Sequence, residues 1–179
     1  MDERLDTPVG YFRDVVLDAD GRVTLERPWC KNVIVDGCRR LLASFMHGAP
    51  PVAGGITGLR VGAGLAAWDT TPPPLPPAST TALADANPFT VPPANLAIDY
   101  LDTASDTVSA TPTNRIQVVA TLGPGVPSWP DANHATITLR EFGLVGTLGG
   151  SNELINYRIH PAIAKDPTST LVRTIWLVF

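Results

Sequence analysis

Short alternating runs of apolar and polar residues dominate the chain and predict a protein built mainly of β-strands. Residues 11–29 indicate a hairpin, because two apolar runs flank Asp20-Gly21, a dipeptide suited to the positive φ of a tight turn. A further strand is predicted over residues 56–61, and five more follow from about residue 95, separated by Pro, Gly, Asn and Asp. The last of these, residues 169–179, is apolar on both faces, which indicates that both faces are covered.

One long helix is predicted over residues 31–48, with Asn32 as its cap and Gly48 as its stop. Apolar residues recur on one stripe of this helix at helical spacing, and we interpret the stripe as core. Its members are Ile34, Cys38, Leu41, Leu42 and Phe45. Gly37, inside the helix, indicates close packing against another element. A second, short helix is expected to begin at Ser79.

The strand at residues 136–146 changes phase at Arg140-Glu141, since apolar residues occupy odd positions before this pair and even positions after it. A strand has period two, so the change predicts a bulge, a turn or a change of partner. A buried Glu141 needs partners. The candidates are Arg115, Arg158, Lys165 and Arg173. We interpret the pair as a polar clasp that fixes the register rather than as catalytic groups.

Composition supports one mainly β domain of ordinary size, with 179 residues, 44% of them hydrophobic. The 18 Pro and 15 Gly predict many turns and long loops, including a proline-rich arm at residues 70–77. We therefore expect an antiparallel β-sandwich-like fold with one packed α-helix and long Pro-rich loops. Residues 1–30 would form an N-terminal arm and hairpin, and residues 31–179 the main domain.

Charge and hydropathy disfavour two classes of partner. The net charge of −4 gives no basic face for nucleic acid. No run approaches the roughly 20 apolar residues that span a bilayer, so we expect no membrane partner. The charged start MDERLDTPVG predicts no signal peptide.

Catalytic and cofactor motifs are not evident in the sequence. Cys30 and Cys38 match no zinc spacing and are interpreted as free thiols, and the three histidines occur singly. Gly62-x-Gly64 follows a strand, but Ala67 stands where a dinucleotide-binding loop needs a third glycine. We interpret it as a tight-turn loop, and we expect no metal, no cofactor and no enzymatic activity.

The order of several motifs resembles the N-terminal collar or attachment domain of bacteriophage tail fibres and related small tail or baseplate proteins. IVDGCRRLLASFMHG is followed by GLRVGAGLAAWDTTPP and STTALAD, then by TITLREFGLVG with Arg140, Glu141, Gly143 and Leu144. Lys165 then precedes the final strand. The resemblance covers residues 31–179 and implies that Arg140-Glu141 is an architectural clasp. We expect Glu141 to pair with Lys165, and we include Gly143 in the clasp.

The resemblance implies a virion structural protein of the tail, assembled in the host cytoplasm: a collar, fibre-attachment or baseplate adaptor subunit. It would form a homo-oligomer, with trimers or hexamers favoured, and dock other phage tail or baseplate proteins. The candidate interface residues are Trp68, Pro72, Pro73, Pro74, Trp129, Trp176 and Phe179. Two alternatives stay open: a head-decoration or neck protein, and a carbohydrate-binding module that uses Trp68 and Trp129.

Overall fold

The computed structural model describes residues 8–48, 53–69 and 72–179. Twelve strands and one α-helix make up its regular structure, together with short 3-10 turns at Ala66–Trp68 and Pro93–Asn95. The elements are β1 (Val9–Leu17), β2 (Val23–Glu26), β3 (Cys30–Ile34), α1 (Asp36–His47), β4 (Ala53–Gly62), β5 (Phe89–Val91), β6 (Leu96–Leu101), β7 (Val108–Ser109), β8 (Arg115–Leu122), β9 (Thr138–Leu148), β10 (Ser151–Leu154), β11 (Asn156–Ala164) and β12 (Thr170–Val178).

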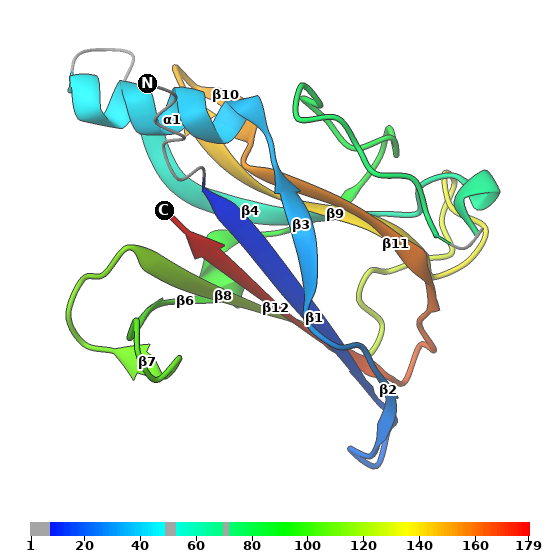
Figure 1. Cartoon of the computed structure of the whole chain (residues 1–179). Coiled ribbons are helices and arrows are strands. Elements are labelled where there is room, and N and C mark those ends of the chain that lie inside the picture. Colours follow the sequence, from blue (N-terminus) through cyan, green and yellow to red (C-terminus); the bar gives the residue numbers. More distant parts are fainter. Residues whose placement is uncertain (1–7, 49–52, 70–71) are drawn as a thin grey trace.

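All strand pairings among the described residues are antiparallel, in the order β5-β4-β9-β11-β3-β1-β12-β8-β6-β7. The strand β10 is added to β9, and β2 is added to β1. The sheet curls, so that the half built on β4, β9 and β11 faces the half built on β1, β12 and β8 (Figure 1). The mainly β, antiparallel fold with one helix is thus confirmed, and β3 joins the two halves into one continuous sheet.

The main core lies between these two halves and contains Phe12, Val118, Phe142, Leu144 and Ile175. A second, smaller core lies on the other side of β9 and β11. It is formed by Val35, Leu83, Val145, Leu154, Tyr157 and Ile159, with Trp68 packed against it.

The segment expected as an N-terminal hairpin contributes an interior strand of the sheet. The strand β1 lies between β3 and β12, and its Phe12 and Val16 belong to the main core. The turn at Asp20-Gly21 forms as expected, with Gly21 at φ +79°. The first seven residues of the expected arm lie outside the described residues.

The predicted helix begins later than expected. Residues 30–34 form β3, which pairs with both β1 and β11, so Asn32 is a strand residue and not a cap. Gly48 ends the helix as predicted, at φ +68° and with its N–H donating to the Ser44 carbonyl. Gly37 does mark close packing, since a Cβ there would lie 2.2 Å from the Leu154 carbonyl oxygen. The short helix expected at Ser79 does not form.

The strand β12 is central, between β1 and β8, and every second residue from Leu171 to Leu177 is buried. Its other face is half-buried, and there Trp176 packs against Trp29 with ring centroids 4.2 Å apart. The doubly apolar pattern therefore corresponds to a core face and a partly covered face.

Candidate functional site

Arg140 and Glu141 lie next to each other on β9, and both bind the loops that cover the second core. Arg140 binds Asp69 and the Ala63 carbonyl, and Glu141 binds the backbone at Ala84 and Asp85. The strands β9 and β11 pair at Glu141–Ile159 and again at Leu139–Ile163. Between these two pairs β9 has one residue, Arg140, whereas β11 has three. The phase change therefore reflects an irregularity in pairing, which lets two successive polar side chains bind two neighbouring loops, Arg140 at residues 63–69 and Glu141 at residues 84–85.

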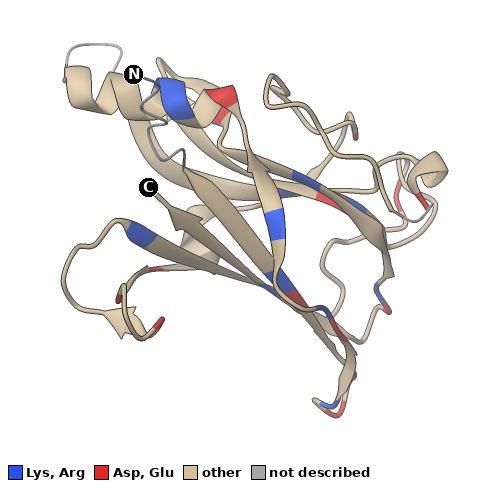
Figure 2. Ribbon diagram, viewed as in Figure 1, with Lys and Arg blue, Asp and Glu red and all other residues tan. Residues whose placement is uncertain are grey.

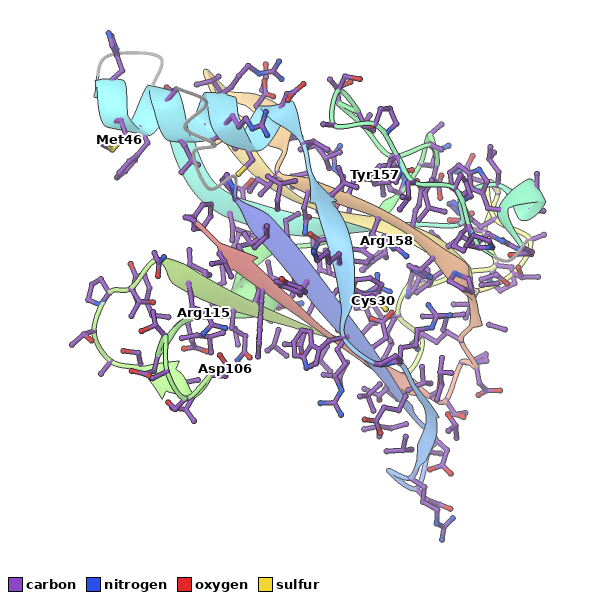
Figure 3. The ribbon with its side chains drawn as sticks, in the orientation of Figure 1. Cys30, Met46, Asp106, Arg115, Tyr157 and Arg158 are labelled. Carbon is purple, nitrogen blue, oxygen red and sulfur yellow. The ribbon has the colours of Figure 1, made fainter. Side chains whose placement is uncertain are left out.

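The Glu141 carboxylate is fully buried and accepts three hydrogen bonds. The Ala84 N–H donates to Oε2 at 3.0 Å, the Asp85 N–H donates to Oε1 at 2.7 Å, and the Tyr157 hydroxyl donates to Oε2. Tyr157 lies on β11 beside β9 (Figure 3). Burial and this bond to Glu141 raise the pKa of Tyr157, so its hydroxyl remains a donor.

Arg140 makes a bidentate contact with Asp69. Its Nε donates to Asp69 Oδ1 at 2.8 Å and its Nη2 to Oδ2 at 2.7 Å, while Nη1 donates to the Ala63 carbonyl at 3.1 Å. The hydrogen bond from Arg140 lowers the pKa of Asp69. Arg140 therefore fixes the path of the chain between β4 and the proline-rich segment.

Asp85 extends the clasp to a third loop. Its Oδ2 accepts from the Ala63 N–H at 2.8 Å and lies 3.0 Å from His134 Nε2. The other ring nitrogen of His134, Nδ1, lies 2.9 Å from Asp131 Oδ1, and Trp129 stacks on the ring with centroids 3.8 Å apart. Segments 63–69, 83–85 and 129–134 are thus bound to one another at this end of β9.

Gly143 of the predicted clasp, and Gly62 and Gly64 of the predicted tight-turn loop, occupy positions where a side chain would collide. A Cβ on Gly62 would lie 2.6 Å from Glu141 Oε1, and one on Gly143 would lie 2.5 Å from the Asn156 carbonyl oxygen. Gly64 has φ +56°, and Trp68 lies against it. Residues 63–65, which follow β4 without regular structure, therefore pack closely against the clasp.

The expected ion pair between Glu141 and Lys165 does not form, and that prediction is wrong. The Lys165 Nζ donates instead to the Gly123 carbonyl at 2.9 Å. Burial lowers the pKa of Lys165. The Glu141 carboxylate is satisfied by two backbone N–H groups and a hydroxyl, which carry no formal charge and leave no signal in the sequence.

A second buried polar cluster was missed in the sequence. Arg173 binds Asp14 through Nε at 2.7 Å and Nη2 at 2.8 Å, and both side chains are fully buried. They are direct cross-strand partners on β12 and β1. Burial alone would raise the pKa of Asp14, but Arg173, and less strongly His160 and Arg27, lower it overall. The sequence feature that could have revealed this cluster is an Asp and an Arg, each at a core-facing position of an otherwise apolar strand.

His160 completes this cluster in its neutral form. Arg173 Nη2 lies 3.0 Å from His160 Nε2, and the guanidinium can only donate, so Nε2 accepts. The other ring nitrogen, Nδ1, lies 2.8 Å from the Pro161 carbonyl oxygen and 3.0 Å from Arg27 Nη1. A guanidinium group therefore faces each ring nitrogen, and this disfavours the charged imidazolium. Burial, with the charge of Arg173, lowers the pKa of His160 to about 3.

The predicted interface residues divide into covered and open ones. Trp129 is only 6% exposed, beneath His134, and Trp68 packs against the second core. Trp176 contacts Trp29 and the Arg115 guanidinium, whose central carbon is 5.5 Å from the centre of the Trp176 ring. Pro72, Pro74 and Phe179 are exposed, and Pro73 is half-buried. Thr70 and Thr71 of the proline-rich arm lie outside the described residues.

Phe179 belongs to an apolar groove of about 480 Å³ at one end of the curled sheet. One wall is the C-terminal half of α1 with the start of β4, and the other is formed by β6, β8 and the end of β12. The helical stripe expected in the core is therefore divided. Cys38 and Leu41 are buried, whereas Leu42 and Phe45 line the open groove.

The described residues hold no group of three or more His, Cys, Asp or Glu side chains placed to bind a metal ion. Within the same ranges, no helix has the length and apolar character needed to cross a bilayer. No family model, curated protein or solved structure matches the chain.

Proposed function

We propose that the protein is a structural subunit of a bacteriophage tail, a collar, fibre-attachment or baseplate adaptor that self-associates and docks other tail proteins. The order of the motifs from residue 31 to the final strand supports this proposal. The clasp supports it as well, because it gives the Arg-Glu-x-Gly-Leu motif an architectural role in fixing three loops on one face of the sheet. The proposed location is the virion tail, after assembly in the host cytoplasm.

The observation that carries the proposal is the open apolar groove. It is lined by apolar side chains that are continuous with the main core, and such a surface is typical of a protein completed by a partner. A subunit of a symmetric assembly presents such surfaces to its neighbours.

Carbohydrate binding is the less favoured alternative because the two tryptophans it would use are engaged within the fold. A sugar-binding Trp needs an open ring face, but Trp129 is covered by His134, and Trp68 packs against Gly64 and the second core. Neither ring is presented as an open platform.

The solution mass of the purified chain, measured by light scattering coupled to gel filtration, tests self-association. A stable trimer or hexamer of the 19.0 kDa chain is expected. A monomer over the whole accessible concentration range would contradict the self-associating part of the proposal.

A further inference from the structure

The inner face of the curled sheet is left uncovered at β6. Ile98 pairs with Val118 on β8, which pairs in turn with Ile175 on β12, so all three side chains share one face. Val118 and Ile175 are fully buried in the main core, yet Ile98 is 42% exposed. Tyr100, two residues along, is exposed in the same way. The sheet therefore extends past the elements that cover its core face.

The helix α1 supplies a matching protrusion on the rim of this face. Leu42, Phe45 and Met46 occupy one side of its last two turns, at spacings of three and four residues. Phe45 is 68% exposed and Met46 is 81% exposed, and Figure 3 shows Met46 at the C-terminal end of the helix. The charged residues of α1 lie in its N-terminal half, so this end carries no Asp, Glu, Lys or Arg (Figure 2).

The area that stays open is close to what a dimer interface requires. Six residues contribute to it: Leu42, Phe45, Met46, Ile98, Tyr100 and Phe179. A fully exposed large side chain presents about 200 Å² to solvent. Multiplied by the exposed fractions of these six residues, this gives a solvent-exposed apolar area on the order of 600 Å². The largest apolar patch of a typical monomer is about 300–600 Å². A standard interface buries about 800 Å² per partner, so this patch supplies most of one partner's share.

We infer that the groove is the site where a second copy of this chain docks, with the Phe45–Met46 end of α1 from one copy packed over the Ile98–Tyr100 face of another. Protrusion and groove lie side by side on the same chain, so each copy offers both halves of the contact. A mutual exchange closes a two-fold dimer, and a head-to-tail exchange closes a ring, such as the expected trimer or hexamer, when the rotation between copies leads back to the first copy. The end of α1 carries no Asp, Glu, Lys or Arg, and the groove is lined by apolar side chains, so the α1 end of a second copy matches the groove without a charged complement. This inference rests on the self-association in the proposed function.

Sedimentation velocity over a concentration series tests the inference, with Phe45→Asp and Met46→Asp as the variants. Both side chains are mostly exposed, so the substitutions leave the monomer folded, and far-UV circular dichroism with thermal unfolding checks this. Val23→Asp is the matched control, since Val23 is 55% exposed, lies on β2 and does not line the groove. We expect each α1 variant to raise the dissociation constant at least about tenfold, and the control to change it less than about twofold.

The outcomes separate the inference from the proposed function. If the wild-type chain associates and both α1 variants associate equally well, the groove is not the contact, and only the inference is overturned. A wild-type chain that remains a monomer overturns both the inference and the self-association on which it rests. If the control weakens association as much as the α1 variants do, the effect is one of added charge, and the inference fails again.

Discussion

Replacement of Glu141 by Gln should destabilise the protein strongly, although the two side chains have nearly the same shape. The two carboxylate oxygens receive three donors, from Ala84, Asp85 and Tyr157. A glutamine amide presents one acceptor oxygen and one NH₂ group, so one backbone N–H must face another donor. The site is fully buried, and water does not replace the lost partner.

The size of the effect follows from these bonds. Loss of one hydrogen bond to a charged group costs about 1.5–3 kcal/mol, and the remaining bonds lose charge assistance. We expect the free energy of unfolding to fall by about 3 kcal/mol. With an m-value of about 2 kcal/mol/M in urea, the midpoint of urea unfolding should fall by about 1.5 M.

Urea titration by tryptophan fluorescence measures this change, and Glu26→Gln is the matched control. Glu26 pairs with Arg13 on the surface, where about half of its side chain is exposed, and such a pair contributes less than about 1 kcal/mol. Hydrogen exchange should also accelerate at the Ala84 and Asp85 amides in Glu141→Gln. An unchanged midpoint, with both amides still protected, would refute the assignment of Glu141 as the centre of the clasp.

Three further predictions concern the buried charges. Asp14→Asn leaves the Arg173 guanidinium buried without its counter-ion, so the free energy of unfolding, measured with urea, should fall by about 3–5 kcal/mol. The double variant Asp14→Leu/Arg173→Met should lose less stability than the two single variants added together. Strict additivity would argue against the pair. Because the folded-state pKa of His160 is about 3 and the usual value is 6.5, the unfolded chain alone binds a proton there as the pH falls from 6.5 towards 3. This residue should therefore lower the free energy of unfolding by up to about 1.4 kcal/mol for each pH unit of acidification. In His160→Gln, the plot of unfolding free energy against pH should be flatter than in the wild type between pH 6.5 and 4.5. Parallel plots for the two proteins would contradict a neutral buried imidazole. A double-mutant cycle of Glu141→Gln and Lys165→Met should give a coupling below about 0.5 kcal/mol, because Lys165 binds the Gly123 carbonyl instead; a coupling above 1 kcal/mol would restore the ion pair.

Strand periodicity predicted much of the sheet, because a half-buried strand leaves a period of two in the sequence. The strands β6, β8, β9 and β12 lie where alternation placed them. The boundary between β3 and α1 was misplaced, since Asn32 and Ile34 fit helical spacing equally well. Residues 30–34 form a strand because β3 pairs with β1 and β11, and β11 is distant in the sequence.

The site was predicted in part for a similar reason. The phase change at Arg140-Glu141 predicted an irregular strand, and the motif placed Gly143 in the clasp. The sequence marked Gly62 and Gly64 only as a loop, and the structure shows that Glu141 and Trp68 lie against them. Two of the three partners of Glu141 are backbone amides in an irregular loop, and an amide is present at almost every residue, so no sequence pattern distinguishes these two. The pair Asp14–Arg173 was detectable, because each charge interrupts the core-facing side of its strand.

The open groove was not predicted because helical periodicity shows which side of α1 is apolar but not how far the covering sheet extends. Leu42 and Phe45 continue the stripe of Cys38 and Leu41 without a break in the sequence. Only the three-dimensional placement of β6 leaves the second half of the stripe without a cover.

The most direct test of the central claim is the location of the protein on virus particles. Particles produced from the genome that encodes this chain would be labelled with a specific antibody and viewed by negative-stain electron microscopy. A tail subunit predicts label at the tail, at the collar or the baseplate. Label on the head would favour a decoration or neck protein, and particles without label that lack the chain by mass spectrometry would contradict a virion role altogether.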